Sequence, residues 1–76
     1  MLNTIKTDIV EDMIKEKLPD YFVFCCIDTR YLMLKIEMVK MLQNNTSETI
    51  GITRNLSSIK SYEDILNEVL AKAGKE

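Results

Sequence analysis

The sequence predicts a small two-layer α+β domain, in which a three-stranded antiparallel sheet carries two helices on one face. Three observations lead to this fold class. The chain of 76 residues is long enough for one domain and too short for two. Apolar residues recur at helical spacing near both ends, and the central part holds short apolar runs typical of strands. We therefore expect the order α-β-β-β-α in a single domain over residues 1–76.

The first helix is predicted over residues 4–18, where apolar side chains follow helical spacing. Asp8 and Glu11 lie early in this segment, where the helix dipole favours acidic side chains. Pro19 ends the segment, because the residue before a proline is disfavoured in the helical region. The positions expected to face the core are Ile5, Ile9, Val10, Met13, Ile14 and Leu18.

Two strands are predicted to follow as a hairpin. Residues 21–27 are aromatic, β-branched or cysteine, which is typical of a strand. A polar break at residues 28–30 separates them from residues 31–41, which alternate between two faces. The face expected to lie under the helices holds Leu32, Leu34, Ile36 and Met38. The opposite face holds Met33, Lys35, Glu37, Val39 and Met41.

A third strand is predicted over residues 48–54, after a turn at residues 43–46 whose asparagines tolerate left-handed backbone angles. The length of the turn sets the register between the second and third strands. A two-residue loop would place Met38 opposite Gly51, whereas a three-residue loop would place it opposite Ile52. We expect the three-residue loop, because it pairs apolar residues with apolar residues.

The last helix is predicted over residues 62–73. Ser61 is a suitable N-cap, and two acidic residues lie in the first turn after it. Gly74 is a suitable C-terminal stop. The apolar positions at helical spacing are Tyr62, Ile65, Leu66, Val69, Leu70 and Ala73.

The two cysteines, Cys25 and Cys26, are neighbours in the first predicted strand and therefore point to opposite faces. They cannot both bind one metal ion while the strand stays regular, and a disulfide between neighbours requires a strained backbone. The chain contains no histidine, so we expect no metal site within one chain and no cofactor. Burial as small apolar side chains is the interpretation that we favour.

The inventory of reactive residues predicts a non-enzymatic protein. Histidine, the commonest general acid or base, is absent. No serine or cysteine has an evident base as a partner. Gly51 and Gly74 are the only glycines, so the chain has no glycine-rich loop that would hold a phosphate. The acidic residues lie on predicted helix surfaces, strand exteriors and turns, where they are usually solvated.

The predicted functional surface is the sheet face that looks away from the helices. The strand over residues 21–27 is apolar on both faces, so one apolar face must point outward in a two-layer fold. We expect this face to bind another protein, or a second copy of the chain in a homodimer. The predicted partner-binding residues are Val23, Cys25, Met33, Lys35, Glu37, Val39 and Met41. The phase of the first strand stays open, and the opposite phase would exchange Cys25 for Cys26 and Val23 for Phe24.

The distribution of charge leaves a nucleic-acid-binding alternative. Residues 1–29 carry three basic against six acidic side chains, residues 30–60 carry five against two, and residues 61–76 carry two against four. The mildly basic middle offers Lys35, Lys40 and Arg54, next to aromatic side chains of the sheet, as an RNA-binding surface.

The predicted order of elements is similar to that of the double-stranded RNA-binding domain. That family contacts phosphates through a basic cluster at the start of its last helix and through a histidine-containing loop. Here the last helix begins Ser61-Tyr62-Glu63-Asp64, which would repel phosphate, and histidine is absent. The resemblance therefore covers the topology only, and no binding residue is carried over from it.

A second alternative comes from the size and acidic character of the chain, which are similar to those of phage and mobile-element inhibitors such as anti-CRISPR proteins. Acidic helix positions would then imitate a row of phosphates on a host nucleic-acid enzyme. These positions are Asp8, Glu11, Asp12 and Glu16. The N-terminus lacks the pattern of a signal peptide, and no apolar run approaches the ~20 residues needed to span a bilayer. We therefore expect a cytoplasmic protein without a membrane partner.

Overall fold

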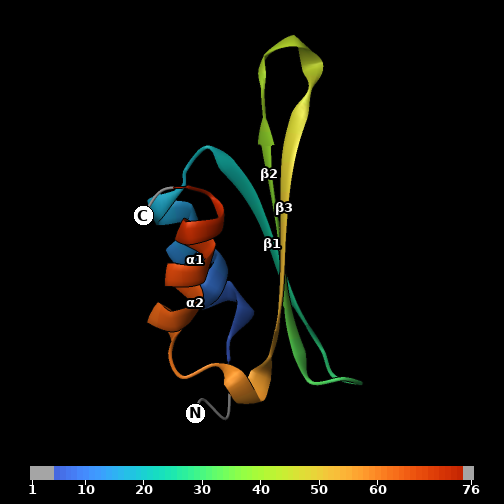
Figure 1. Ribbon diagram of the computed structural model, residues 1–76, viewed down its shortest axis with the longest axis vertical. Coiled ribbons are helices and arrows are strands. Elements are labelled where there is room, and N and C mark those ends of the chain that lie inside the picture. Colours follow the sequence, from blue (N-terminus) through green and yellow to red (C-terminus); the bar gives the residue numbers. More distant parts are fainter. Residues whose placement is uncertain (1–4, 75–76) are drawn as a thin grey trace.

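The computed structural model describes residues 5–74 and shows, within them, two α-helices and one antiparallel sheet of three strands. The strands lie side by side in the order β1-β2-β3, and both helices cover the same face of the sheet (Figure 1). This confirms the α+β fold class and the order α-β-β-β-α. The elements are α1 (Thr7–Lys17), β1 (Tyr21–Asp28), β2 (Met33–Met41), β3 (Ser47–Asn55) and α2 (Tyr62–Lys72).

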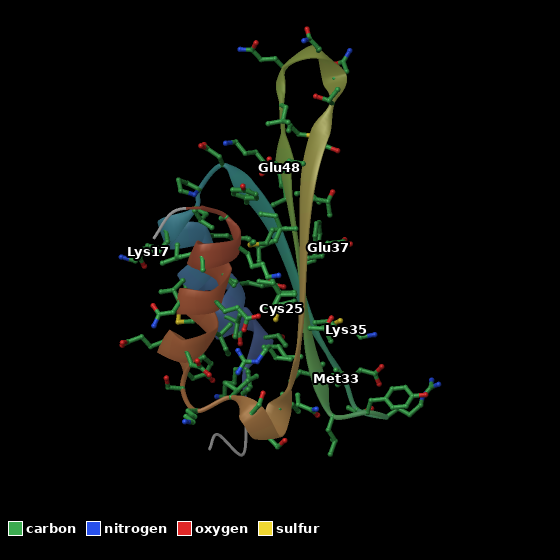
Figure 2. All side chains as sticks on the ribbon, in the orientation of Figure 1. Lys17, Cys25, Met33, Lys35, Glu37 and Glu48 are labelled. Carbon is green, nitrogen blue, oxygen red and sulfur yellow. The ribbon has the colours of Figure 1, made fainter. Side chains whose placement is uncertain are left out.

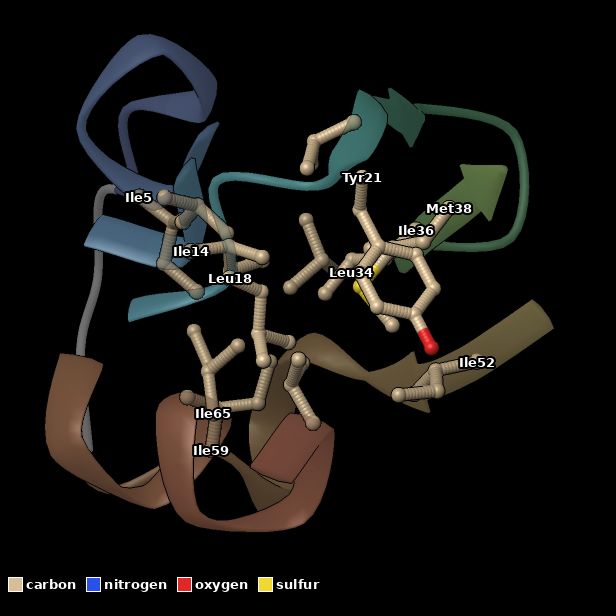
Figure 3. Close-up of a cluster of buried hydrophobic side chains, with 13 residues drawn as sticks. Ile5, Ile14, Leu18, Tyr21, Leu34, Ile36, Met38, Ile52, Ile59 and Ile65 are labelled. Carbon is tan, nitrogen blue, oxygen red and sulfur yellow. The ribbon is translucent and has the colours of Figure 1, made fainter. Parts of the chain in front are cut away.

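The hydrophobic core lies between the two helices and the inner face of the sheet (Figure 3). Every second side chain of β2 points into this layer because side chains alternate along a strand. On α1 and α2 the inward side chains are those three or four residues apart, which share one face of a helix. Among the described residues, the buried apolar side chains are Ile5, Val10, Ile14, Leu18, Tyr21, Val23, Leu34, Ile36, Met38, Ile52, Ile59, Ile65 and Val69.

Helix α1 begins at Thr7, later than the predicted start at residue 4, which lies outside the described residues. Lys6 is extended, and its backbone N–H donates to the hydroxyl oxygen of Tyr62 at 3.1 Å. This bond to the start of α2 competes with helical continuation toward the N-terminus. Ile5 is still buried in the core, although it precedes the helix.

The β2–β3 connection has the predicted length but a different register. Leu42 N–H donates to the carbonyl oxygen of Thr46 at 2.9 Å, which closes a three-residue turn at Gln43–Asn45. Met38 was expected opposite Ile52 but lies opposite Ile50. Ile52 lies opposite Ile36. Asn44 and Asn45 decide this register, because both take positive φ angles, of 68° and 61°, and so form the bend.

Leu32 does not lie under the helices, which corrects its predicted inward position. Its side chain is 61% exposed, and its φ angle is 53°. The β1–β2 connection spans residues 29–32, because the Asp28 carboxylate accepts hydrogen bonds from the backbone N–H groups of Arg30 and Tyr31, at 2.9 and 3.4 Å. This turn ends the alternation before β2 begins at Met33.

Helix α2 is fixed at its start by the predicted cap, in which Ser61 Oγ accepts a hydrogen bond from the Asp64 N–H at 3.1 Å. Arg54, near the end of β3, holds α2 against the sheet. Its guanidinium group forms ion pairs with the carboxylates of Asp64 and Glu68, and it donates to the Ser58 carbonyl oxygen at 3.2 Å. The positive charge of Arg54, on β3, is therefore paired with carboxylates of the same chain.

Candidate functional site

The outer face of the sheet is the candidate functional site. Figure 2 shows Met33, Lys35 and Glu37 projecting from β2 on the side opposite the helices. Because opposite residues of antiparallel strands point to the same face, the register places side chains of β1 and β3 beside them. We call this surface the outer face, and its central residues are Phe22, Phe24, Cys26, Met33, Lys35, Glu37, Val39, Met41, Thr49, Gly51 and Thr53.

The expected phase of β1 is wrong. Val23 is only 4% exposed, and Cys25 is half-buried against the core, so neither projects from the outer face. Phe22, Phe24 and Cys26 take the outward positions instead, which is the opposite phase that the sequence left open. The remaining predicted residues, Met33, Lys35, Glu37, Val39 and Met41, do lie on the outer face.

Contacts at the start and in the middle of β1 explain this phase. The Tyr21 ring is buried, and its hydroxyl group donates to the Glu48 carboxylate at 2.9 Å. The N–H of Cys25 donates to the Glu11 carboxylate of α1 at 3.0 Å. The helix therefore lies close over the inward residues, which suits the small Val23 and Cys25 better than two phenylalanine rings.

Two aromatic rings form the apolar part of the outer face. Phe22 and Phe24 are each 58% exposed, although phenylalanine is among the residue types most often buried. Phe22 lies opposite Val39 on β2, and Phe24 lies opposite Glu37. Sequence reasoning placed Phe24 at the site only in the opposite phase that it left open and did not include Phe22, because both faces of β1 are apolar.

The polar part of the outer face has little net charge. Lys35 Nζ lies 3.6 Å from the Asp28 carboxylate, and Glu37 adds a second acidic group. Glu37 lies opposite Gly51 of β3, which has no side chain. A depression crosses the three strands here and is lined by residues that include Phe24, Glu37 and Gly51. A Cβ atom at Gly51 would meet nothing within 4 Å, so the chain's own packing does not require glycine there.

The two thiols differ in environment, as their adjacent positions predict. Burial, and secondarily the negative charge of Glu11, raises the pKa of Cys25 to about 12, so this thiol stays protonated at neutral pH. Cys26 is exposed on the outer face. Within residues 5–74, no group of three or more histidine, cysteine, aspartate or glutamate side chains is arranged to hold a metal ion.

The acidic surface of α1 is less continuous than its sequence suggests. Asp8, Asp12 and Glu16 are exposed, but Glu11 is partly buried and accepts the bond from Cys25. Lys15 is also exposed on this short helix and lies between the acidic positions Asp12 and Glu16. Glu11 therefore has a structural role that the sequence alone did not reveal.

Comparisons of this chain with protein-family models, curated proteins and solved structures find no match. In the described part of the chain, no helix combines the length and the apolar character that crossing a membrane requires.

Proposed function

We propose that this chain is a non-enzymatic protein-binding module, and that its outer face docks on a partner protein. The observation that supports this most strongly is the pair of exposed rings, Phe22 and Phe24, on the outer face of the sheet. Burying a phenylalanine side chain fully contributes about 1.5–3 kcal/mol. Because each ring is already partly buried, covering both rings with a partner would contribute about that much in total. Exposed apolar patches of this kind commonly mark binding surfaces.

The charges of the outer face favour a protein partner over a nucleic acid. Stacking of bases on Phe22 and Phe24 would need basic groups beside them to hold the phosphates. Lys35 is the basic group of this face, and it is paired with Asp28 and flanked by Glu37. Arg54, which the nucleic-acid alternative requires, is occupied by two carboxylates of α2.

Cys26 allows a direct test, because its exposed thiol lies on the outer face whereas Cys25 is half-buried and protonated. A maleimide photo-cross-linker attached at Cys26 should capture a protein partner in an extract of the native host. A Cys26→Ala chain with a new cysteine at the exposed helix position Lys17 carries the same cross-linker on the opposite side and serves as the control.

The proposed function requires that the captured protein depends on the rings. Phe22→Ser with Phe24→Ser should remove the cross-linked product made at Cys26 while leaving the circular dichroism spectrum unchanged, since both rings are exposed. Products that are the same from Cys26 and from the Lys17 position, or that survive loss of both rings, would refute a role for the outer face. Capture of nucleic acid instead would favour the alternative.

A further inference from the structure

The free edge of β3 is unprotected from Thr49 to Thr53, and only near its end does the Asn55 carbonyl oxygen accept a hydrogen bond from Ser58 Oγ, at 2.8 Å. The ladder between β2 and β3 uses the even-numbered residues, because Leu42 N–H donates to Thr46 and Leu56 N–H donates to Leu32 in the same register. Antiparallel ladders alternate, so the backbone groups of Thr49, Gly51 and Thr53 point away from β2. These residues are exposed, and the β3 segment contains no proline or lysine, which commonly block such edges.

The edge of β1 differs from that of β3. Its outward-pointing N–H groups at Tyr21 and Cys25 donate to the Leu18 carbonyl oxygen, at 3.1 Å, and to the Glu11 carboxylate, at 3.0 Å. Helix α1 therefore occupies this edge with its own groups. Of the two sheet edges, β3 is the one left available for pairing with another strand.

The sequence of β3 is complementary to itself when it is read in the antiparallel direction. The strand reads SETIGITRN, with Gly51 at its centre. Around this centre Thr49 matches Thr53, and Ile50 matches Ile52. Glu48 matches Arg54, which places opposite charges at equal distances from Gly51. Cross-strand pairs of opposite charge and of β-branched residues are stabilising.

We propose that two copies of this chain pair through their β3 edges, antiparallel and around a two-fold axis at Gly51, so that their three-stranded sheets join into one. In this register Thr49 of one copy exchanges hydrogen bonds with Thr53 of the other, and the two Gly51 residues exchange theirs across the axis. A two-fold interface uses the same surface on both copies, which the sequence symmetry of β3 satisfies.

The charges and the side-chain directions agree with this arrangement. Opposite residues in antiparallel strands share a face, so Ile50 and Glu48 lie beside Ile52 and Arg54 of the second copy on the helix side. Arg54 keeps its ion pairs within its own α2, so Glu48 adds attraction at longer range. The helices of both copies lie on the same side of the joined sheet, and both outer faces stay open on the other.

The β3 edge is a different surface from the outer face that carries the proposed function. The edge dimer would place two outer faces next to each other, with their depressions at Gly51 adjoining across the axis. A dimer formed through the outer face would instead leave the β3 edge free. The two kinds of association therefore give different patterns of amide protection.

Amide hydrogen exchange, followed residue by residue by nuclear magnetic resonance at high and low protein concentration, tests the pairing. In a single copy, Ile50 and Ile52 are protected by β2, whereas Thr49, Gly51 and Thr53 exchange fast. In the edge dimer these three amides should slow by at least about tenfold as the concentration rises. Fast exchange at these positions in a particle of dimeric mass would overturn the inference, and so would a chain that stays monomeric.

Substitutions at Thr49 provide a matched pair for light scattering in the presence of reductant. Thr49→Pro removes only an N–H that points away from β2, so the sheet within one copy is retained, and the mass should fall from twice 8.8 kDa to 8.8 kDa. Thr49→Ala keeps the N–H and should stay dimeric. A dimeric Thr49→Pro chain would overturn the inference.

Glu48→Lys is a second variant that does not depend on how proline fits the strand. Within its own chain Glu48 accepts the hydrogen bond of Tyr21, so the comparison is with Glu48→Ala, which loses the same bond. The new lysine would face Arg54 of the second copy, so dimerisation should be at least about tenfold weaker in Glu48→Lys than in Glu48→Ala. A Glu48→Lys dimer as strong as that of Glu48→Ala would refute the register centred on Gly51. Cross-linking at Cys26 tests the outer face alone. A failure of the β3-edge dimer would therefore leave the proposed binding of a partner by the outer face untouched, and the reverse also holds.

Discussion

At the scale of single residues, Tyr21 and Cys25 link the stability of the fold to pH. Burial, followed by the hydrogen bond to Glu48, raises the pKa of Tyr21, and burial raises the pKa of Cys25 to about 12. Both groups are neutral in the folded chain. In the unfolded chain they ionise near their ordinary pKa values of 10.0 and 9.0, so unfolding releases protons at alkaline pH.

We therefore expect the stabilisation from these groups to be complete below about pH 9 and to be lost progressively as the pH rises toward 12. Urea unfolding at pH 7 and pH 10.5 should show a smaller alkaline loss of unfolding free energy for Tyr21→Phe with Cys25→Ala than for the natural chain. Tyr31→Phe is the control, because Tyr31 is exposed. Equal alkaline losses in all three chains would contradict this linkage.

The residue scale is also where prediction from the sequence fails. Alternation reveals which residues of β2 share a face, because charged and apolar residues take turns there. In β1 both faces are apolar, so the pattern contains no information on which face is buried. The decision comes from Glu11 and Tyr21, whose partners lie far away in the chain. Those contacts select the phase that turns Phe22 and Phe24 outward, which the sequence had left as the alternative.

At the scale of elements, Arg54 connects β3 to α2. Arg54→Ala would leave Asp64 and Glu68 without their cation and would remove the bond to the Ser58 carbonyl oxygen. We expect a loss of about 1–2 kcal/mol in unfolding free energy, because these ion pairs are partly exposed. Chemical denaturation measures it.

Arg30→Ala is the matched control for this prediction. Arg30 is an exposed residue of the β1–β2 connection, so its substitution should change stability by less than about 0.5 kcal/mol. Similar effects of the two substitutions would show that Arg54 does not fasten α2 to the sheet.

The elements themselves were largely predictable from the sequence. Helical spacing, Pro19 and the Ser61 cap place α1 and α2 to within a few residues, because these signals are local. The turn at Gln43–Asn45 has the predicted length, but its bend lies one residue earlier, since Asn44 and Asn45 both adopt positive φ angles. The strand order already makes β3 an edge, but which of the two edges stays open was beyond prediction, because it depends on where α1 lies along β1.

For the molecule as a whole, a substitution at Gly51 should have opposite effects on the stability of the fold and on partner binding. Gly51→Thr should raise the unfolding free energy by roughly 0.5–1 kcal/mol, because glycine weakens a strand and the added side chain meets no neighbour. The same substitution fills the depression of the outer face, so capture of a partner through Cys26 should decrease. Thermal unfolding and the cross-linking yield measure the two effects.

Gly74→Thr is the contrasting control. Gly74 has a φ angle of 73°, which a threonine adopts only with strain, so this substitution should lower stability. If Gly51→Thr both stabilises the fold and keeps full cross-linking, the depression has no part in binding.

The order of the strands in the sheet equals their order in the chain. Each strand therefore pairs with its nearest neighbour in sequence, and the sheet can assemble through two successive hairpins with short loops. Local pairing of this kind favours rapid folding. Helix α2 is synthesised after the three strands, and it brings Ile65 and Val69 to the core. We expect the three strands of a nascent chain to pair before α2 packs against them, so that part of the inner face stays exposed until then.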